Sequence, residues 1–172
     1  GNTAYGFNAL DAITTGDYNT VLGDSAGTAI NSGSSNTLIG RLSGDALTTG
    51  FGNVALGYAT LSTEDTHGKN VAIGYTALTA QDAGADAYNV AVGYEAGVAM
   101  TTGINNTLVG GLAGDALTTG SRNVAIGYGA LSTEDANGKN VAIGYYSLVN
   151  QNAGAEAYNV AVGYESGREI TT

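Results

Sequence analysis

The side chains best suited to chemistry form two matching acidic pairs, Glu64-Asp65 and Glu134-Asp135, each followed closely by Gly-Lys-Asn. Loop carboxylates of this kind can bind Ca²⁺. A pair of carboxylates supplies too few ligands, however, and the surrounding spacing is not that of a calcium loop. We therefore predict a solvated acidic rim with no metal ion or cofactor bound. Such charges also keep a β-rich surface soluble.

No catalytic group can be assembled from the remaining residues. His67 is the single histidine, Asn137 takes its place in the second copy of the segment, and the chain contains no cysteine. Ser/His/Asp or Cys/His chemistry therefore has no basis. Gly68-Lys69 and Gly138-Lys139 resemble a phosphate loop only weakly, because Asn follows each Lys and the upstream Gly is missing. A polysaccharide-cleaving enzyme would need paired acids at a groove, and no pair stands apart from the repeat. The sequence predicts a protein that is not an enzyme.

A column of tyrosines is the remaining candidate for ligand contact. Each follows the Gly that closes a short repeated phrase, and flat aromatic faces often contact sugar rings. The alternative, which we favour, is a packing stripe at a corner of the fold or between subunits. Two longer turns, Gln81 to Tyr88 and Gln151 to Tyr158, are further candidates for receptor contact. The tyrosines are Tyr58, Tyr75, Tyr94, Tyr128, Tyr145 and Tyr164.

The elements that must position these residues follow from a repeat. An Asn followed by three mostly apolar residues and a Gly occurs ten times, at nearly even intervals along the chain. A fixed period of about 20 residues indicates a solenoid, in which each turn buries its apolar side chains on its neighbours. Stacked Asn side chains can hydrogen-bond from turn to turn, so we predict a structural ladder rather than a ligand site. Beyond Asn2, the ladder comprises Asn19, Asn36, Asn53, Asn70, Asn89, Asn106, Asn123, Asn140 and Asn159.

The sequence also repeats with a longer period that spans several turns. The segment Gly44 to Gly50 returns unchanged at Gly114 to Gly120. Four turns therefore make one duplicated unit. We predict a single repeat domain over residues 1–172, with a partial first turn at 1–18 and four-turn units at about 31–100 and 101–170. We expect this domain to be a fragment of a longer fibre.

Each turn is expected to contain two short strands and a loop. β-Branched residues such as Thr20 and Val71 dominate the position after Asn, and apolar residues such as Ile39 and Ile126 end the phrase before Gly. Frequent Gly disfavours helix by about 0.5 to 1 kcal/mol at each site. The strand has no polar face, so one face should pack inside the coil and the other against another chain. The predicted fold class is all-β, a parallel β-solenoid of about ten turns that self-associates with closed symmetry.

Composition excludes several classes of partner. A net charge of −10 would repel nucleic acid phosphates. No apolar run approaches the roughly 20 residues that a membrane-spanning helix requires, so we expect no direct membrane insertion. The absence of cysteine leaves the redox compartment undecided.

The repeats resemble a known family. The segments Asn140 to Ser147 and Asn159 to Ser166 are similar to the head repeats of trimeric autotransporter adhesins, the YadA-like heads, and to repeats of phage tail fibres. That resemblance implies a left-handed parallel β-roll, a homotrimer, and an extracellular location in a cell-surface or virion fibre. The turns of this chain are longer than those of the adhesin heads, and most have Ala where that family has Ser.

Two functional hypotheses follow. The first is a non-enzymatic structural or adhesive module of a trimeric fibre, acting as a rigid spacer or a head that binds a host-surface glycan or protein. At about 4.8 Å per turn it would be a rod on the order of 50 Å long. The alternative is a monomeric ice- or carbohydrate-binding β-solenoid, although a Thr-x-Thr array is missing. Exposure of the tyrosines distinguishes the sugar-binding hypothesis from a buried packing stripe.

Overall fold

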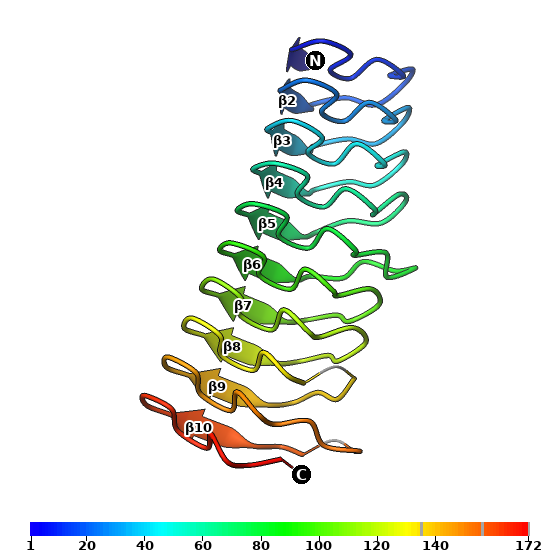
Figure 1. Ribbon diagram of the computed structural model, residues 1–172. Helices are drawn as coiled ribbons and strands as arrows, with labels where there is room; N and C mark the ends of the chain where they lie inside the picture. Colours follow the sequence, from blue (N-terminus) through cyan, green and yellow to red (C-terminus); the bar gives the residue numbers. More distant parts are fainter. Residues whose placement is uncertain (135, 156, 172) are drawn as a thin grey trace.

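The computed structural model is a single coil of ten short parallel strands (Figure 1), and it describes residues 1–172 apart from 135, 156 and 172. Each strand pairs in register with the next, in the order β1 to β10. This confirms an all-β parallel solenoid, with ten strands and therefore nine steps between them. The described part contains no helix able to cross a membrane. The strands are β1 (Thr3–Tyr5), β2 (Thr20–Leu22), β3 (Thr37–Ile39), β4 (Val54–Leu56), β5 (Val71–Ile73), β6 (Val90–Val92), β7 (Thr107–Val109), β8 (Val124–Ile126), β9 (Val141–Ile143) and β10 (Val160–Val162).

Each turn contains one strand, so the expectation of two strands per turn is wrong. In the turn that begins at Asn123, the second expected strand is replaced by a tight bend. There Gly127, Gly129 and Leu131 have φ angles of 131°, 61° and 56°. Alternating positive φ values cannot form an extended strand. Turn after turn, the chain leaves β-structure immediately after the phrase that ends in Gly.

The Gly at this corner is required by close stacking as well as by its φ angle. A Cβ built on Gly127 would lie 2.4 Å from the carbonyl oxygen of Gly144 in the next turn. No side chain fits in that space, so the backbones of these two turns can approach this closely only if residue 127 is Gly.

The core is a set of columns that run along the inside of the coil. The middle residue of every strand from β2 to β10 is buried, as in Leu38 and Ala125. A second core column is filled by either of two positions that lie three residues apart. In one turn Gly44 has no side chain, and Leu47 fills the core. In the next turn Leu61 stands at the position of Gly44 and fills the core, and Glu64 stands at the position of Leu47. A Cβ on Gly44 would meet Leu47 at 2.9 Å, which explains the exchange.

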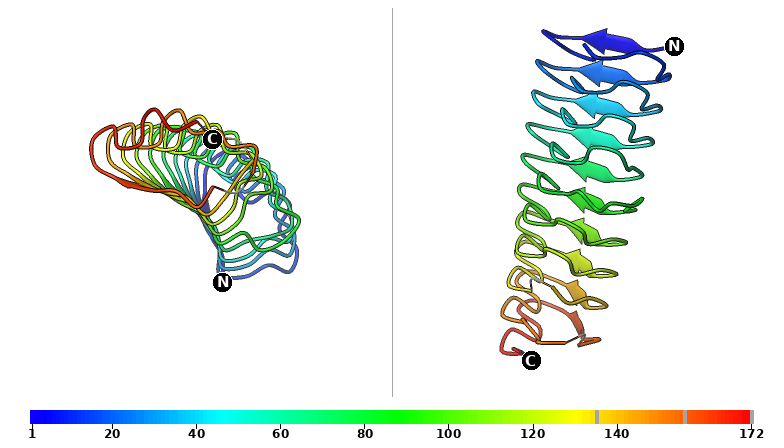
Figure 2. Two further views of the ribbon diagram at one scale, coloured as in Figure 1. Left: turned by 90° about the horizontal axis from the view of Figure 1, so that it is seen from below. Right: turned by 90° about the vertical axis from the view of Figure 1, so that its right-hand side faces the viewer.

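The outer face of the sheet is apolar and open in the single chain. The first and third residues of each strand lie on this face, where they are half-buried or exposed. Not one of these ten short strands includes a charged residue. Figure 2 shows that each turn is rotated relative to the one before it, so the face twists along the rod.

Candidate functional site

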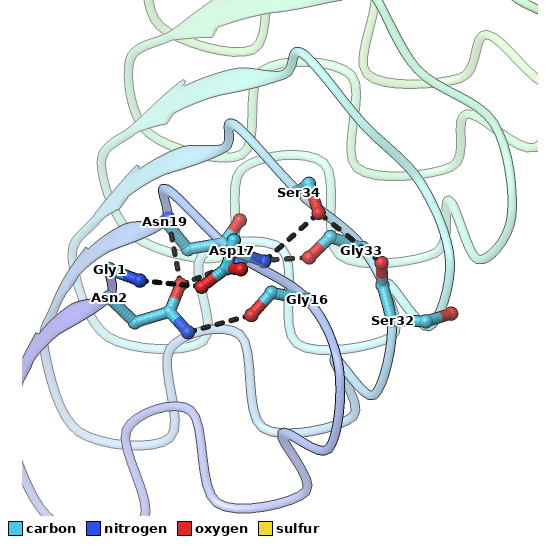
Figure 3. A network of polar contacts seen from close by, with 8 residues as sticks. All are labelled: Gly1, Asn2, Gly16, Asp17, Asn19, Ser32, Gly33 and Ser34. Carbon is cyan, nitrogen blue, oxygen red and sulfur yellow. Dashed lines mark hydrogen bonds and ion pairs between the residues drawn. The ribbon is translucent and has the colours of Figure 1, made fainter.

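The Asn residues form a continuous hydrogen-bonded ladder along one corner. The backbone N–H of each Asn donates to Oδ1 of the Asn one turn earlier, at 2.8–3.1 Å, in all nine steps. Figure 3 shows the first step, from Asn19 to Asn2. Asn2 Nδ2 in turn donates to the carbonyl of Gly16 at 2.8 Å. These side chains hold successive turns together, and most of them are fully buried.

The ladder is less complete in the two longer turns. In the shorter turns Nδ2 donates to a backbone carbonyl near the end of its own turn, as from Asn36 to Gly50 and from Asn106 to Gly120, both at 2.9 Å. Asn70 and Asn140 begin the longer turns, and their buried Nδ2 atoms have no hydrogen-bond partner among the described residues. We attribute this to the extra residues of these turns, which displace the carbonyl that would accept.

The tyrosine column forms two stacks of three rings. Tyr58, Tyr75 and Tyr94 stack with centroid distances of 5.2 and 5.6 Å, and the second stack repeats this one four-turn unit later at 5.8 and 5.3 Å. The six rings are 38–73% exposed. Ring planes lie within 17° of parallel. The middle ring of each stack, Tyr75 or Tyr145, therefore has a neighbouring ring on both sides.

Gly111 separates the two stacks. It occupies the tyrosine position of its turn, between Tyr94 and Tyr128. A Cβ on Gly111 would lie 3.2 Å from the ring of Tyr128, which therefore leans over the gap. At the other end of the first stack, the guanidinium of Arg41 lies 5.7 Å from the centroid of Tyr58. The rings thus form a stripe that packs on itself but faces solvent.

The acidic pairs differ from the sequence prediction. Glu64 and Glu134 are fully buried, so the predicted solvated acidic rim is wrong for both, while Asp65 is exposed and Asp135 lies outside the described residues. Both glutamates take the inward position that Leu47 takes in another turn. The exchange of Gly-x-x-Leu for Leu-x-x-Glu in the sequence was the signal that could have identified them.

The two buried glutamates have different partners. Glu134 Oε1 accepts hydrogen bonds from Asn137 N at 3.0 Å and Nδ2 at 3.2 Å, and Glu134 Oε2 accepts one from Gln151 at 2.6 Å. Glu64 Oε1 accepts from the backbone N–H of His67 at 3.2 Å, and Oε2 has no hydrogen-bond partner among the described residues. Burial raises the pKa of the Glu64 carboxyl, an effect that the His67 hydrogen bond partly opposes.

The longer turn at Gln81 to Tyr88 holds a lysine in a polar and aromatic cluster. Lys69 Nζ donates to Asp86 at 2.6 Å and to the Tyr88 hydroxyl at 2.9 Å, and it lies 5.0 Å from the centroid of the Phe51 ring. The hydrogen bond to Asp86 raises the pKa of the Lys69 ammonium and lowers the pKa of the Asp86 carboxyl. In the second unit, Lys139 makes the same contact with Tyr158 at 3.0 Å.

Comparison with known proteins adds no relative. No protein-family model, no curated protein and no solved structure matches this chain. Functional inference therefore depends on the geometry above.

Proposed function

We propose that this chain is a non-enzymatic structural module, a rigid rod that assembles with two further copies into a trimeric fibre. The outer face of the sheet supports the proposal. It presents two columns of mostly Val, Thr, Ile and Leu over ten strands, without a charge in any strand. Leaving such a face in water forgoes about 25 cal/mol for each Å² of apolar surface that could be buried. Large exposed apolar patches in soluble proteins mark interaction surfaces.

A second copy of the chain is the partner that this face fits best. Its two columns repeat with the same one-turn spacing on every copy, so apolar columns from two copies can interdigitate along the whole rod. A foreign partner would need an equally long apolar surface of matching spacing. Three copies and left-handed coiling follow from the resemblance to YadA-like heads and fibre repeats. The same resemblance supports an extracellular fibre on a cell or virion surface.

In such a fibre the tyrosine stripe and the longer turns are the candidate receptor contacts. The rings of both stacks remain exposed in the single chain, with Tyr164 at 73%. The proposed receptor is a host-surface glycan or protein.

A monomeric carbohydrate-binding solenoid is the second candidate, and the exposed tyrosines favour it. Its difficulty is geometric, since sugars stack on open ring faces and the middle ring of each stack has a neighbouring ring on both sides. Ice binding has less support, because the outer face twists along the rod (Figure 2) and a flat lattice requires a flat face.

Light scattering with size-exclusion chromatography tests the proposal. We expect a mass of three times the chain mass of 17.1 kDa. Ile126→Lys places a charge on the outer face of β8, where the side chain is 37% exposed, and should yield monomers. Thr49→Lys, on an exposed site outside the sheet, is the matched control and should remain trimeric. A monomeric wild-type chain would refute the trimer and favour the carbohydrate-binding alternative.

A further inference from the structure

Three potential metal ligands come together in the turn that begins at Asn53. Glu64, Asp65 and His67 each offer one ligand atom, and these atoms lie within 4.8 Å of one another. Glu64 comes from the core, Asp65 from the surface, and the side chain of His67 is 30% exposed. The group therefore runs from the inside of the coil to its surface.

One oxygen of the Glu64 carboxylate lacks a hydrogen-bond partner. The side chain is 0% exposed, and its Oε2 atom is buried without a hydrogen bond from any described residue. A buried carboxylate oxygen in this state is costly unless something compensates for lost hydration.

The duplicated unit supplies an internal comparison. At the equivalent position both oxygens of Glu134 accept hydrogen bonds, from Asn137 and Gln151. In the first unit the corresponding Gln81 instead donates to the carbonyl of Thr101 at 3.0 Å. The amide that satisfies Glu134 is thus directed away from Glu64, and the unit that lacks this amide contact is the one that has a histidine.

The charges near Glu64 also favour a cation. Asp82 acts on the Glu64 carboxyl as a second negative charge, and Asp65 is its sequence neighbour. Lys69, the cation two residues after His67, already forms an ion pair at 2.6 Å with a carboxylate of the longer turn. The imidazole of His67 lies beside the carboxylate, with Nδ1 at 3.8 Å from Glu64 Oε1 and at 2.9 Å from the Thr66 hydroxyl, and it is charged only if protonated.

We propose that Glu64, Asp65 and His67 bind one divalent transition-metal ion of the Zn²⁺ class, with water completing its coordination. One imidazole nitrogen and two carboxylate oxygens suit Zn²⁺ better than Mg²⁺ or Ca²⁺, which prefer oxygen ligands alone. The ion supplies the positive charge that the buried carboxylate lacks and ties the loop to the core. The ligands lie outside the strands, so the site does not use the strand residues that the proposed trimer would bury.

Isothermal titration of the whole metal-free chain with ZnCl₂ tests the site. We expect one Zn²⁺ per chain and no comparable binding of Mg²⁺. His67→Asn introduces the residue that the second unit has at this position, so it should leave the fold intact. It should weaken Zn²⁺ binding by more than about tenfold, the smaller end of what loss of even an outer partner costs. Glu64→Gln should weaken binding likewise, and Asp11→Asn, an exposed acid in the first turn, should not.

A second measurement separates specific binding from loose association. The histidine ring signals in the NMR spectrum come from one residue, because His67 is the single histidine. One equivalent of Zn²⁺ should shift them, and chelation should restore them. Absence of Zn²⁺ binding, unshifted His67 signals, or equal affinity in His67→Asn would each overturn the proposal.

Discussion

The backbone N–H of Asn123 donates to Oδ1 of Asn106 at 2.9 Å, so a side chain in one turn fixes the main chain of the next. Asn106 also donates through Nδ2 to the carbonyl of Gly120 at 2.9 Å. One residue therefore satisfies two buried backbone groups that the short strands leave unpaired. The same relationship between consecutive turns explains why a chain with such short strands can form an ordered rod.

Asn106→Ala should destabilise the rod more than Asn70→Ala does. Both changes remove the side-chain oxygen that accepts from the backbone N–H of the next Asn. Asn106→Ala also removes the two hydrogen bonds that Asn106 Nδ2 donates to Gly120 and Asn89, whereas Asn70 Nδ2 has no described partner to lose. An orphaned buried group costs about 1–3 kcal/mol, so we expect Asn106→Ala to cost roughly 1–3 kcal/mol more. Chemical denaturation monitored by circular dichroism measures the difference. Equal losses would mean that the Nδ2 contacts contribute nothing.

Gly127→Ala should prevent correct stacking at β8. The added Cβ would lie 2.4 Å from the Gly144 carbonyl oxygen, and the residue has a φ angle of 131° that side chains resist. We expect a loss of more than about 3 kcal/mol, or no folded protein. Gly154→Ala is the control, because nothing lies within 4 Å of the place that its Cβ would take and no positive φ applies there. Thermal unfolding of the two variants gives the comparison, and a mild effect at Gly127 would contradict the stacking argument.

The sequence predicted the parts of the fold that recur with the period. Strand positions follow from the Asn and Gly spacing, because a side chain that repeats every turn must occupy the same column. The bend after the strand could not be predicted, since Leu131 adopts a φ angle of 56° that its side chain disfavours and only tertiary packing imposes. The sequence predicts a surface position for Glu64 because carboxylates are rarely buried. The structure explains its burial: Leu61 takes the core position that Gly44 has one turn earlier, and Glu64 takes the buried position of Leu47.

Asp115 should make the rod less stable as pH rises. Burial raises the pKa of its carboxyl above the ordinary 3.8, and its Oδ1 atom is buried without a described partner. The folded state therefore binds the proton more tightly than the unfolded chain does. Stability from this group is full below about pH 3.8 and is lost as pH rises through the folded pKa.

Asp115→Asn removes this dependence. We expect the variant to gain stability relative to wild type between pH 4 and 7, by a modest amount because the side chain is only partly buried. Asp11→Asn makes the same change in net charge at an exposed site and is the control. Unfolding midpoints measured across this pH range decide the matter. A gain of the same size in both variants would show that net charge alone is responsible.

Gly111→Tyr should join the two tyrosine stacks into one. Gly111 has no positive φ, so the substitution imposes no backbone strain, and the new ring would lie between Tyr94 and Tyr128. Its Cβ would lie 3.2 Å from the half-exposed Tyr128 ring, which must shift by a few tenths of an ångström to make room. Each new ring pair contributes about 0.5–1.5 kcal/mol, so unfolding should require more denaturant. Gly111→Ala separates the backbone effect from the ring effect, because both variants lose the same glycine freedom. If alanine stabilises the rod as much as tyrosine does, stacking between neighbouring turns is not what holds the stripe in place.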